Sequence, residues 1–481
     1  MNVTMIGAGR VGLVGAACLA ELGLNVHCVD KMAKRIDGLR EGTMPFREPG
    51  LAELVRKNAR AGRLSFSTSL DEAVDRSLVL FIAVGTEDEA PGRPNLKDLF
   101  EVGRQIARVM KEYKVLAIKS TVPPGTARRL AAELKNEAAP AFDIVSNPEF
   151  LREGSAIENF MRPDRVVLGG NSQYALAIMR DIYRPLYLSE TPIVTTDNDT
   201  AELAKYACNA FLSVKISFIN EMANICDSLG LNVSDVARVL GLDRRIGPKF
   251  LHAGPGFGGS CLPKDTRALI AAARGAGCEV PVVEGAYRTN QALRAYLVDQ
   301  LKSVVGPLGG RLIGVLGLSY KAGTDDVRES PAMEFVRLLL EEGATVQAFD
   351  PAANGAISAA LEHDRLRVVS DPYEAAAHAD AVTILTEWGE FRDLDLRKLQ
   401  NAMDGNVIQD TRNIFRPDMA VAHGFVYLGR GRGTHGVRKE PRSPSPPDRS
   451  EAANGRPPVE SAAAAGGAFS VTMAGPEEDA P

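Results

Sequence analysis

The chain has 481 residues, enough for two or three domains, and a hydrophobic share of 45% that is ordinary for a globular protein. Its net charge is −5 without a long run of one sign, so the composition favours neither nucleic acid nor an anionic membrane as a partner. Six cysteines include no CxxC pair, which argues against a zinc knuckle, a redox dithiol or a secreted disulfide framework. No apolar run reaches the roughly 20 residues of a membrane helix. We therefore expect a reduced, cytoplasmic enzyme without a metal site.

The first part of the chain alternates between short apolar runs and helical patterns. Predicted strands span residues 2–6, 26–30, 78–84, 115–121, 143–150 and 165–170. Predicted helices between them include residues 11–22 and 96–110. Strands that alternate with helices in this way predict a parallel, doubly wound sheet.

The pattern changes at residue 200, where a long amphipathic helix begins that Gly230 closes, and helical segments continue to about residue 303. Alternation resumes at residue 311. The sequence thus predicts an α/β protein with two Rossmann-like doubly wound domains joined by a mainly helical central domain. After residue 431, Pro, Ser, Gly and Ala dominate, which predicts a disordered tail. The expected boundaries are 1–196, 197–305, 306–430 and 431–481.

A dinucleotide site is predicted at the first turn. GAGRVG places Gly7, Gly9 and Gly12 in GxGxxG spacing between a strand and a helix. These glycines allow the tight turn, the approach of a pyrophosphate and close helix–strand contact. Asp30 ends the next strand, where a carboxylate accepts from a ribose 2′-OH and repels a 2′-phosphate. The cofactor is therefore expected to be NAD rather than NADP, a preference that nearby Arg35 weakens slightly.

Lys205 and Asn209 lie four residues apart on the long predicted helix, so their side chains share one face. Together they are able to donate to an oxygen that becomes negative during a reaction. From the spacing alone, a solvated helix face is the favoured interpretation.

Cys261 follows the glycine-rich loop GPGFGGS and precedes a predicted helix with Pro263 in its first turn. A thiol near a helix N-terminus and a lysine is expected to have a lowered pKa and to be a nucleophile. The other five cysteines are interpreted as packing residues.

Several motifs together resemble the UDP-glucose/GDP-mannose dehydrogenase family over residues 1 to about 430, in the right order. They are GAGRVG at 7–12, EPGL at 48–51, KSTVPPGT at 119–126, NPEFLREGSAI at 147–157, ELAKYACNAFLSVKISFINE at 202–221, RRIGPKFLHAGPGFGGSCLPKD at 244–265, GLSYKAGTDDVRESP at 317–331 and DTRNIF at 410–415.

The resemblance implies oxidation of a sugar C6 alcohol to a carboxylate in two NAD-dependent steps, with Cys261 forming a thiohemiacetal and then a thioester. It implies that Lys205 and Asn209 stabilise the C6 oxyanion, that Asp265 and Thr121 hold a water, and that Glu149 assists thioester hydrolysis. His252 is the less favoured alternative base. Cofactor contacts are implied for Gly7, Gly9, Val11, Gly12, Asp30, Arg35, Thr86, Thr121, Glu153, Lys264 and Arg328.

Substrate contacts implied by the resemblance come from all three predicted domains, the last of which would hold the UDP. They are Glu149, Phe150, Leu151, Arg152, Glu153, Lys205, Asn209, Arg245, Phe250, Leu251, His252, Ala253, Gly254, Gly258, Lys321 and Arg412. Arg245 resembles an arginine donated across a dimer interface, so a homodimer is expected.

The substrate implied is UDP-glucose, with UDP-glucuronate as a precursor for polysaccharides. GDP-mannose or a UDP-N-acetylhexosamine is the nearest alternative. A one-step NAD-dependent hydroxyacid dehydrogenase and a non-catalytic binding protein are the other classes. The chain departs from the family pattern at Thr86-Glu87, in the segment EDEAPGRPN, at Thr411 in DTRN and at Leu262 in CLPKD.

Overall fold

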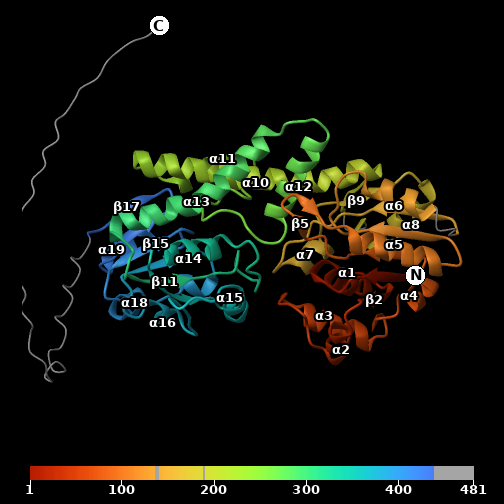
Figure 1. Cartoon of the computed structure of the whole chain (residues 1–481), viewed down its shortest axis with the longest axis horizontal. Coiled ribbons are helices and arrows are strands. Elements are labelled where there is room, and N and C mark those ends of the chain that lie inside the picture. The colour runs from red at the N-terminus through yellow and green to blue at the C-terminus, as the bar shows by residue number, and fades with distance from the viewer. Residues whose placement is uncertain (136–139, 188–189, 438–481) are drawn as a thin grey trace, which may run out of the picture. The chain divides into compact units, whose positions relative to one another are not determined.

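The computed structural model describes residues 1–135, 140–187 and 190–437, which belong to one compact unit, Met1–Glu440 (Figure 1). Its first part is an eight-stranded sheet in the order β10-β9-β8-β7-β4-β1-β2-β3. The strands are β1 (Asn2–Ile6), β2 (Asn25–Val29), β3 (Leu64–Ser67), β4 (Val79–Ile82), β7 (Lys114–Ile118), β8 (Phe142–Ser146), β9 (Val166–Gly169) and β10 (Ile193–Thr196). The helices are α1 (Arg10–Glu21), α2 (Ala33–Glu41), α3 (Leu51–Arg60), α4 (Leu70–Arg76), α5 (Lys97–Val109), α6 (Thr126–Leu134), α7 (Ala156–Met161), α8 (Gln173–Ile182) and α9 (Arg184–Tyr187).

Both faces of this sheet are buried, which explains why its strands read as continuous apolar runs. In β4, Val79 and Phe81 pack into one core cluster, whereas Leu80 and Ile82 pack into the other. The alternation follows from the two-residue period of a strand. The doubly wound arrangement predicted from the sequence is confirmed.

The prediction of a wholly parallel sheet is wrong at one edge. β9 pairs with β8 in the antiparallel sense through Ser146 and Gly169, and β10 runs parallel to β9. The predicted strand 143–150 also ends early, at Ser146. Pro148 has no N–H to give to a ladder, so the chain leaves the sheet there.

The middle of the chain is helical, as predicted, and Figure 1 shows its long helices lying across both sheet-containing parts. Its helices are α10 (Asn198–Leu229), α11 (Val233–Leu242), α12 (Leu262–Gly275) and α13 (Pro281–Val305). α10 begins where Asp197 accepts from Thr200 N–H and ends at Gly230, whose φ of 68° is left-handed. An acceptor at the first position and a glycine after the last are the usual signals of helix ends.

α10 is attached to both sheet-containing parts. Near its start, buried Glu202 accepts from the N–H groups of Thr126 and Ala127 at 3.1 and 2.9 Å, which caps α6. Near its end, Asp227 lies 3.0 Å from buried Arg430, which comes from the last part of the chain. One helix therefore fixes elements of two sheets.

The last part is a seven-stranded sheet in the order β13-β12-β11-β14-β15-β16-β17, parallel except for β17 at its edge. The strands are β11 (Leu312–Leu316), β12 (Thr345–Phe349), β13 (Leu366–Val368), β14 (Ala381–Ile384), β15 (Val407–Asp410), β16 (Val426–Gly429) and β17 (Gly433–His435). The helices are α14 (Pro331–Glu341), α15 (Asn354–Ala360), α16 (Pro372–Ala376), α17 (Gly389–Arg392), α18 (Leu396–Ala402) and α19 (Pro417–Ala422).

β17 lies within the segment predicted as tail, so the folded chain continues beyond residue 430. The rest of that predicted tail, 438–481, lies outside the described residues. None of the helices in the described ranges is both long and apolar enough to cross a membrane.

Candidate active site

The glycine turn of the predicted dinucleotide site has the required backbone geometry. Gly7 has a φ of 103°, and a Cβ there would lie 2.4 Å from the Ala83 carbonyl oxygen. A Cβ on Gly12 would lie 1.8 Å from the Gly7 carbonyl oxygen. A Cβ on Gly9, at the start of α1, would meet nothing within 4 Å. The turn is thus close-packed behind the helix N-terminus and open in front of it, which fits a bound pyrophosphate.

Asp30 is held at the end of β2 by three donors. Its carboxylate accepts from Ala8 N–H at 2.8 Å, from Met32 N–H at 2.9 Å and from Arg35 at 2.7 Å. Burial would raise the pKa of Asp30, but these hydrogen bonds outweigh burial and lower it. The carboxylate is therefore ionised at neutral pH and available to a ribose hydroxyl.

A cavity of about 760 Å³ lies beside this site. α10, α12 and the loop after β8 all contribute to its wall. The predicted site residues that line it are Glu149, Phe150, Leu151, Arg152, Glu153, Lys205, Asn209, Phe250, Gly258, Cys261 and Lys321. The structure thus gathers residues from widely separated motifs in one concave space.

Lys205 and Glu149 form a buried ion pair in this cavity. Lys205 Nζ lies 3.3 Å from Glu149 Oε1 and 5.1 Å from the centre of the Phe150 ring. Burial alone would lower the pKa of Lys205, but Glu149, Asp265 and Cys261 reverse this effect and raise it. A buried, permanently charged ammonium is suited to stabilising an oxyanion.

Asn209 shares the inner face of α10 with Lys205, so the solvated-face interpretation is wrong: the two residues are only 7% and 3% exposed. Its Nδ2 donates to Asp265 Oδ2 at 2.6 Å, and Lys264 Nζ lies 2.8 Å from Asp265 Oδ1. Asp265 is itself 1% exposed. These contacts hold the Asn209 amide beside Asp265 at the cavity wall.

Cys261 is the residue immediately before α12 and lines the cavity next to this cluster. The expected lowered pKa is wrong. Desolvation, Glu149 and Asp265 raise the pKa of Cys261 to about 11, whereas Lys205 and Ser260 lower it only partly. Two carboxylates from distant motifs outweigh the lysine and the helix N-terminus on which the sequence-based expectation rested.

We expect the alkylation of Cys261 by iodoacetamide to accelerate by about tenfold per pH unit up to a midpoint near pH 11, because only the thiolate reacts. Since Glu149 is among the groups that raise this pKa, Glu149→Gln is expected to lower the midpoint. Mass spectrometry of the peptide that contains Cys261, across pH 6 to 11.5, measures both effects. A plateau below pH 9 in the unmodified chain would contradict this assignment.

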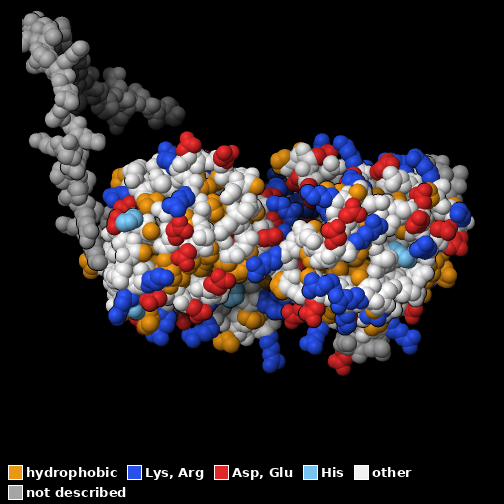
Figure 2. All heavy atoms as spheres, turned by 90° about the horizontal axis from the view of Figure 1, so that it is seen from below, with side chains coloured by type: hydrophobic (Ala, Val, Ile, Leu, Met, Phe, Trp, Pro, Cys, Tyr) orange, Lys and Arg blue, Asp and Glu red, His pale blue; other side chains and the backbone are white. Residues whose placement is uncertain are grey.

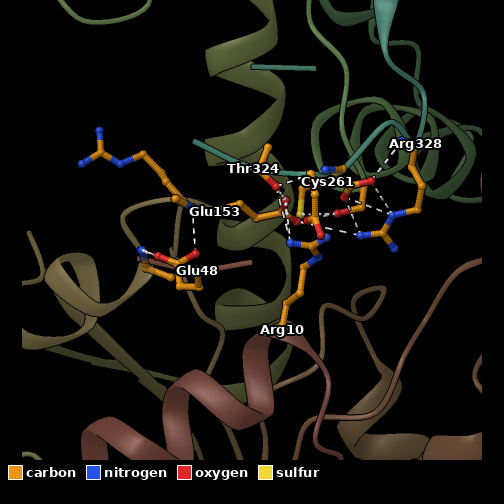
Figure 3. A network of polar contacts seen from close by, with 12 residues as sticks. Arg10, Glu48, Glu153, Cys261, Thr324 and Arg328 are labelled. Atoms are coloured by element: carbon orange, nitrogen blue, oxygen red, sulfur yellow. Dashed lines mark hydrogen bonds and ion pairs between the residues drawn. The ribbon is translucent and has the colours of Figure 1, made fainter. Parts of the chain in front are cut away.

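The loop between β11 and α14, which belongs to the last sheet, lies beside Cys261 (Figure 3). Arg328 is held by Asp326 through contacts of 2.6 to 3.1 Å, and its carbonyl accepts from Gly259 N–H at 3.1 Å. Lys321 lines the cavity, and Arg412 pairs with Glu387 at 3.1 Å beside Tyr320. This part of the chain thus brings three further cations to the site.

Other predicted residues lie around the cavity rather than on its wall. Thr86 donates to the Thr121 carbonyl at 2.9 Å, next to the end of β7. Leu251 and Ala253 are buried in a small core with α10 and α11, and Gly254 lies against Arg412. His252 is exposed and outside the cavity wall.

Arg245 is not brought to the site within this chain. Its side chain is 89% exposed and paired with Asp243 at 2.6 Å. Val11 is half-buried in the first turn of α1, away from the cavity wall.

The three departures from the family pattern have local explanations. The segment after Thr86 forms a hairpin of β5 (Asp88–Ala90) and β6 (Arg93–Pro94), in which Asp88 pairs with Arg267 of α12 at 3.2 Å. Thr411 is buried and donates to the Ile384 carbonyl at 2.6 Å. Leu262 lines the cavity directly after the cysteine.

Sequence analysis missed several residues of the cavity wall. Buried Lys119 donates to Asn147 Oδ1 at 3.2 Å, and burial lowers the pKa of Lys119 to about 8. Arg165 stacks on Phe150 at 3.5 Å, and Tyr320 lies against Gly259. Lys119 belongs to the KSTVPPGT motif, and this motif is the one feature of the sequence that could have identified it as a site residue. In the described ranges, no cluster of three His, Cys, Asp or Glu side chains is placed to hold a metal ion.

Comparison with known proteins places this site in a family. The model of the UDP-glucose/GDP-mannose dehydrogenase family matches with its NAD binding domain over residues 1–187, its central domain over 199–292 and its UDP binding domain over 314–417. A UDP-glucose 6-dehydrogenase of Rhizobium meliloti (strain 1021) is 48% identical over 90% of this chain and 100% of its own length. One of Bacillus subtilis (strain 168) is 42% identical over 90% of this chain and 93% of its own.

Among solved structures, a UDP-glucose dehydrogenase of Pyrobaculum islandicum is 38% identical, with a TM-score of 0.83 over 89% of this chain and 97% of its own. The dinucleotide fold and the adjoining thiol-containing cavity define an oxidoreductase that uses NAD. The chain belongs to the UDP-glucose/GDP-mannose dehydrogenase family.

Proposed function

We propose that this protein oxidises UDP-glucose to UDP-glucuronate, supplying a precursor for polysaccharides. The observation that carries the proposal is that Cys261 lines the same cavity as Lys205 and Asn209, so a thiol and two oxyanion donors face one space. The names of the relatives from Rhizobium meliloti and Bacillus subtilis support UDP-glucose as the substrate.

The glycine turn and Asp30 would hold NAD⁺, which would supply the hydride acceptor for two successive oxidations at C6. In the first, the C6 hydroxyl loses its proton to a water held by Asp265 and Thr121, while Lys205 and Asn209 donate to the developing alkoxide. The hydroxymethyl carbon becomes an aldehyde. Lys205 and Asn209 are within reach of one oxygen because they share the inner face of α10.

Cys261 then gives its proton to the water held by Asp265 and Thr121, and the thiolate adds to the aldehyde, forming a C–S bond and a thiohemiacetal oxyanion that the same two donors hold. Loss of the second hydride gives a thioester, which retains the sugar on the chain. Glu149 activates a water as general base, the water breaks the C–S bond, and the products are the carboxylate and the free thiol.

The remaining predicted contacts are proposed to divide between the two ligands. Residues 1–196 would hold the cofactor, 306–430 the UDP, and 197–305 the catalytic helix. Arg328 and Lys264 would face the cofactor, with Lys321 and Arg412 on the sugar nucleotide. These assignments follow the family resemblance, together with the place of Lys321 on the cavity wall.

A homodimer is also part of the proposal, because the central helices carry large apolar side chains that are mostly exposed in the single chain. On α10 and α11, Phe211 is 63% exposed, Leu229 67% and Leu242 79%. Arg245 follows α11 directly and would reach the neighbouring site. A cytoplasmic location is proposed with it. On the face shown in Figure 2, acidic and basic side chains are interspersed over most of the surface. The net charge of −5 does not favour nucleic acid as a partner.

Stoichiometry tests the proposed function. We expect two NADH per UDP-glucose consumed, with UDP-glucuronate as the product identified by mass spectrometry. A one-step dehydrogenase would release one NADH per substrate and stop at the carbonyl product. Faster NADH formation with GDP-mannose than with UDP-glucose would overturn the choice of substrate.

A further inference from the structure

Arg10 is a residue to which neither the cofactor nor the chemistry assigns a role. It occupies a variable position of the glycine motif and is the first residue of α1. The three glycines provide the backbone geometry that a pyrophosphate needs, so the motif makes no demand on this side chain. Its long cationic side chain is therefore available for contacts other than those with the pyrophosphate.

The side chain of Arg10 extends from the N-terminus of α1 to the loop between β11 and α14 (Figure 3). Its Nη2 lies 3.1 Å from Asp325 Oδ1, and its Nη1 lies 3.5 Å from Thr324 Oγ1. Phe46 packs below it, with the ring centre 5.1 Å from the guanidinium carbon. The side chain is 23% exposed, so these contacts are only partly screened by water.

Glu153 joins Arg10 to the cysteine loop. Its Oε2 lies 3.5 Å from Arg10 and accepts from Thr324 at 3.2 Å, while its Oε1 accepts from Ser260, the neighbour of Cys261, at 3.4 Å. Burial raises the pKa of Glu153, and Arg10 is the strongest group opposing that rise. Arg10 therefore helps to keep a charged carboxylate at the centre of the network.

The loop between β11 and α14, which Arg10 contacts, carries residues that are proposed to bind both ligands. Lys321 lies on the cavity wall, and Arg328 lies 3.9 Å from Glu153. The loop also approaches the first part of the chain through its backbone, since a Cβ on Gly154 would lie 3.0 Å from the Gly323 carbonyl oxygen. The backbones of the two segments are thus in close contact at Gly154 and Gly323, next to the charged contact of Arg10 with Asp325.

We propose that Arg10 is a positioning residue that couples the two ligand sites, by tying the helix N-terminus that receives the cofactor to the loop that receives the sugar nucleotide. A ligand that orders either end favours the tied arrangement, and so strengthens binding of the other ligand by the same factor. This inference rests on the proposed function, because it takes NAD and UDP-glucose as the two ligands.

Equilibrium binding of a non-reacting pair tests the coupling. NADH is titrated by its fluorescence without and with saturating UDP-glucose, and the ratio of the two Kd values is the coupling factor. For the unmodified chain we expect a factor of about five or more, the low end of ordinary coupling. Arg10→Met and Asp325→Asn should each reduce it to about twofold or less, and the double variant should lose nothing further.

Arg311→Met is the matched control. Arg311 pairs with Asp380 at 2.6 Å with similar exposure, 29% and 27%, but at the amino ends of β11 and β14, opposite the site. The Arg311→Met variant should retain the full coupling factor of the unmodified chain. Its melting temperature should equal that of Arg10→Met. Arg10→Lys keeps the charge without the forked geometry and should recover part of the coupling.

Unchanged coupling in Arg10→Met, additive losses in the double variant, or no coupling in the unmodified chain would each overturn the inference. Coupling that depends on Arg10, in a protein that releases no NADH from UDP-glucose, would overturn the proposed function instead.

Discussion

Cys261→Ser is expected to lower the rate of UDP-glucuronate formation by about a thousandfold or more, the usual scale for removing a nucleophile. A serine hydroxyl in the same place is far less acidic and less nucleophilic than a thiol. The surroundings that raise the pKa of Cys261, namely desolvation inside the cavity together with the charges of Glu149 and Asp265, disfavour an alkoxide even more. The first hydride transfer does not need the sulfur, so at most one NADH per site should form quickly.

Rapid mixing with NAD⁺ and UDP-glucose, followed by quenching and mass spectrometry, separates these events. The unmodified chain should pass through a covalent adduct on Cys261, and the serine variant should carry none. Cys278→Ser is the matched control, because Cys278 is also exposed but lies outside the cavity wall. Full-rate acid formation by Cys261→Ser would refute the covalent route.

Lys205→Met is expected to lower kcat by about 100- to 1,000-fold, the usual cost of removing one donor from an oxyanion site. The methionine fills a similar volume beside Phe150 but offers no charge to the C6 oxygen. Because Lys205 opposes the rise in the pKa of Cys261, its loss should also raise the pH at which the thiol reacts. KM for UDP-glucose should change much less than kcat, since the donor acts mainly in the transition state.

Stability needs a separate control for this variant. Removing Lys205 leaves the buried Glu149 carboxylate without its partner at 3.3 Å, a change that typically costs about 3–5 kcal/mol. Lys205→Met combined with Glu149→Gln removes both charges and should regain most of the melting temperature without regaining activity. Because Glu149 is itself the proposed general base, this double variant reports on stability alone; a melting temperature as low as that of Lys205→Met would contradict the contribution assigned to the ion pair.

Local chemistry explains what the sequence predicted well. The limits of α10 follow from an acceptor at Asp197 and a glycine at position 230, and the cofactor turn follows from three spaced glycines. These features depend on neighbours within a few residues. The direction of β9 in the sheet does not depend on nearby residues, because an apolar run has the same composition whether its strand runs parallel or antiparallel to its neighbour.

The electrostatics of the site were the least predictable part. Cys261 was interpreted through its neighbour Lys264 and the start of α12, but Glu149 also acts on its pKa from more than a hundred residues earlier in the chain. The partners of Arg10 likewise lie about three hundred residues away. The hairpin at residues 88–94 was missed because its strands are short and polar, without the alternation that identifies longer ones.

The continuity of α10 restricts how this chain is able to vary in length. Each residue of a helix advances the axis by about 1.5 Å and turns it by about 100°. One residue gained or lost between Glu202, which caps α6, and Asp227, which binds Arg430, would therefore rotate one attachment away from its partner. Insertions and deletions should be tolerated in the surface turns of both sheets and excluded from this stretch, as a library of single-codon indels selected for activity would reveal.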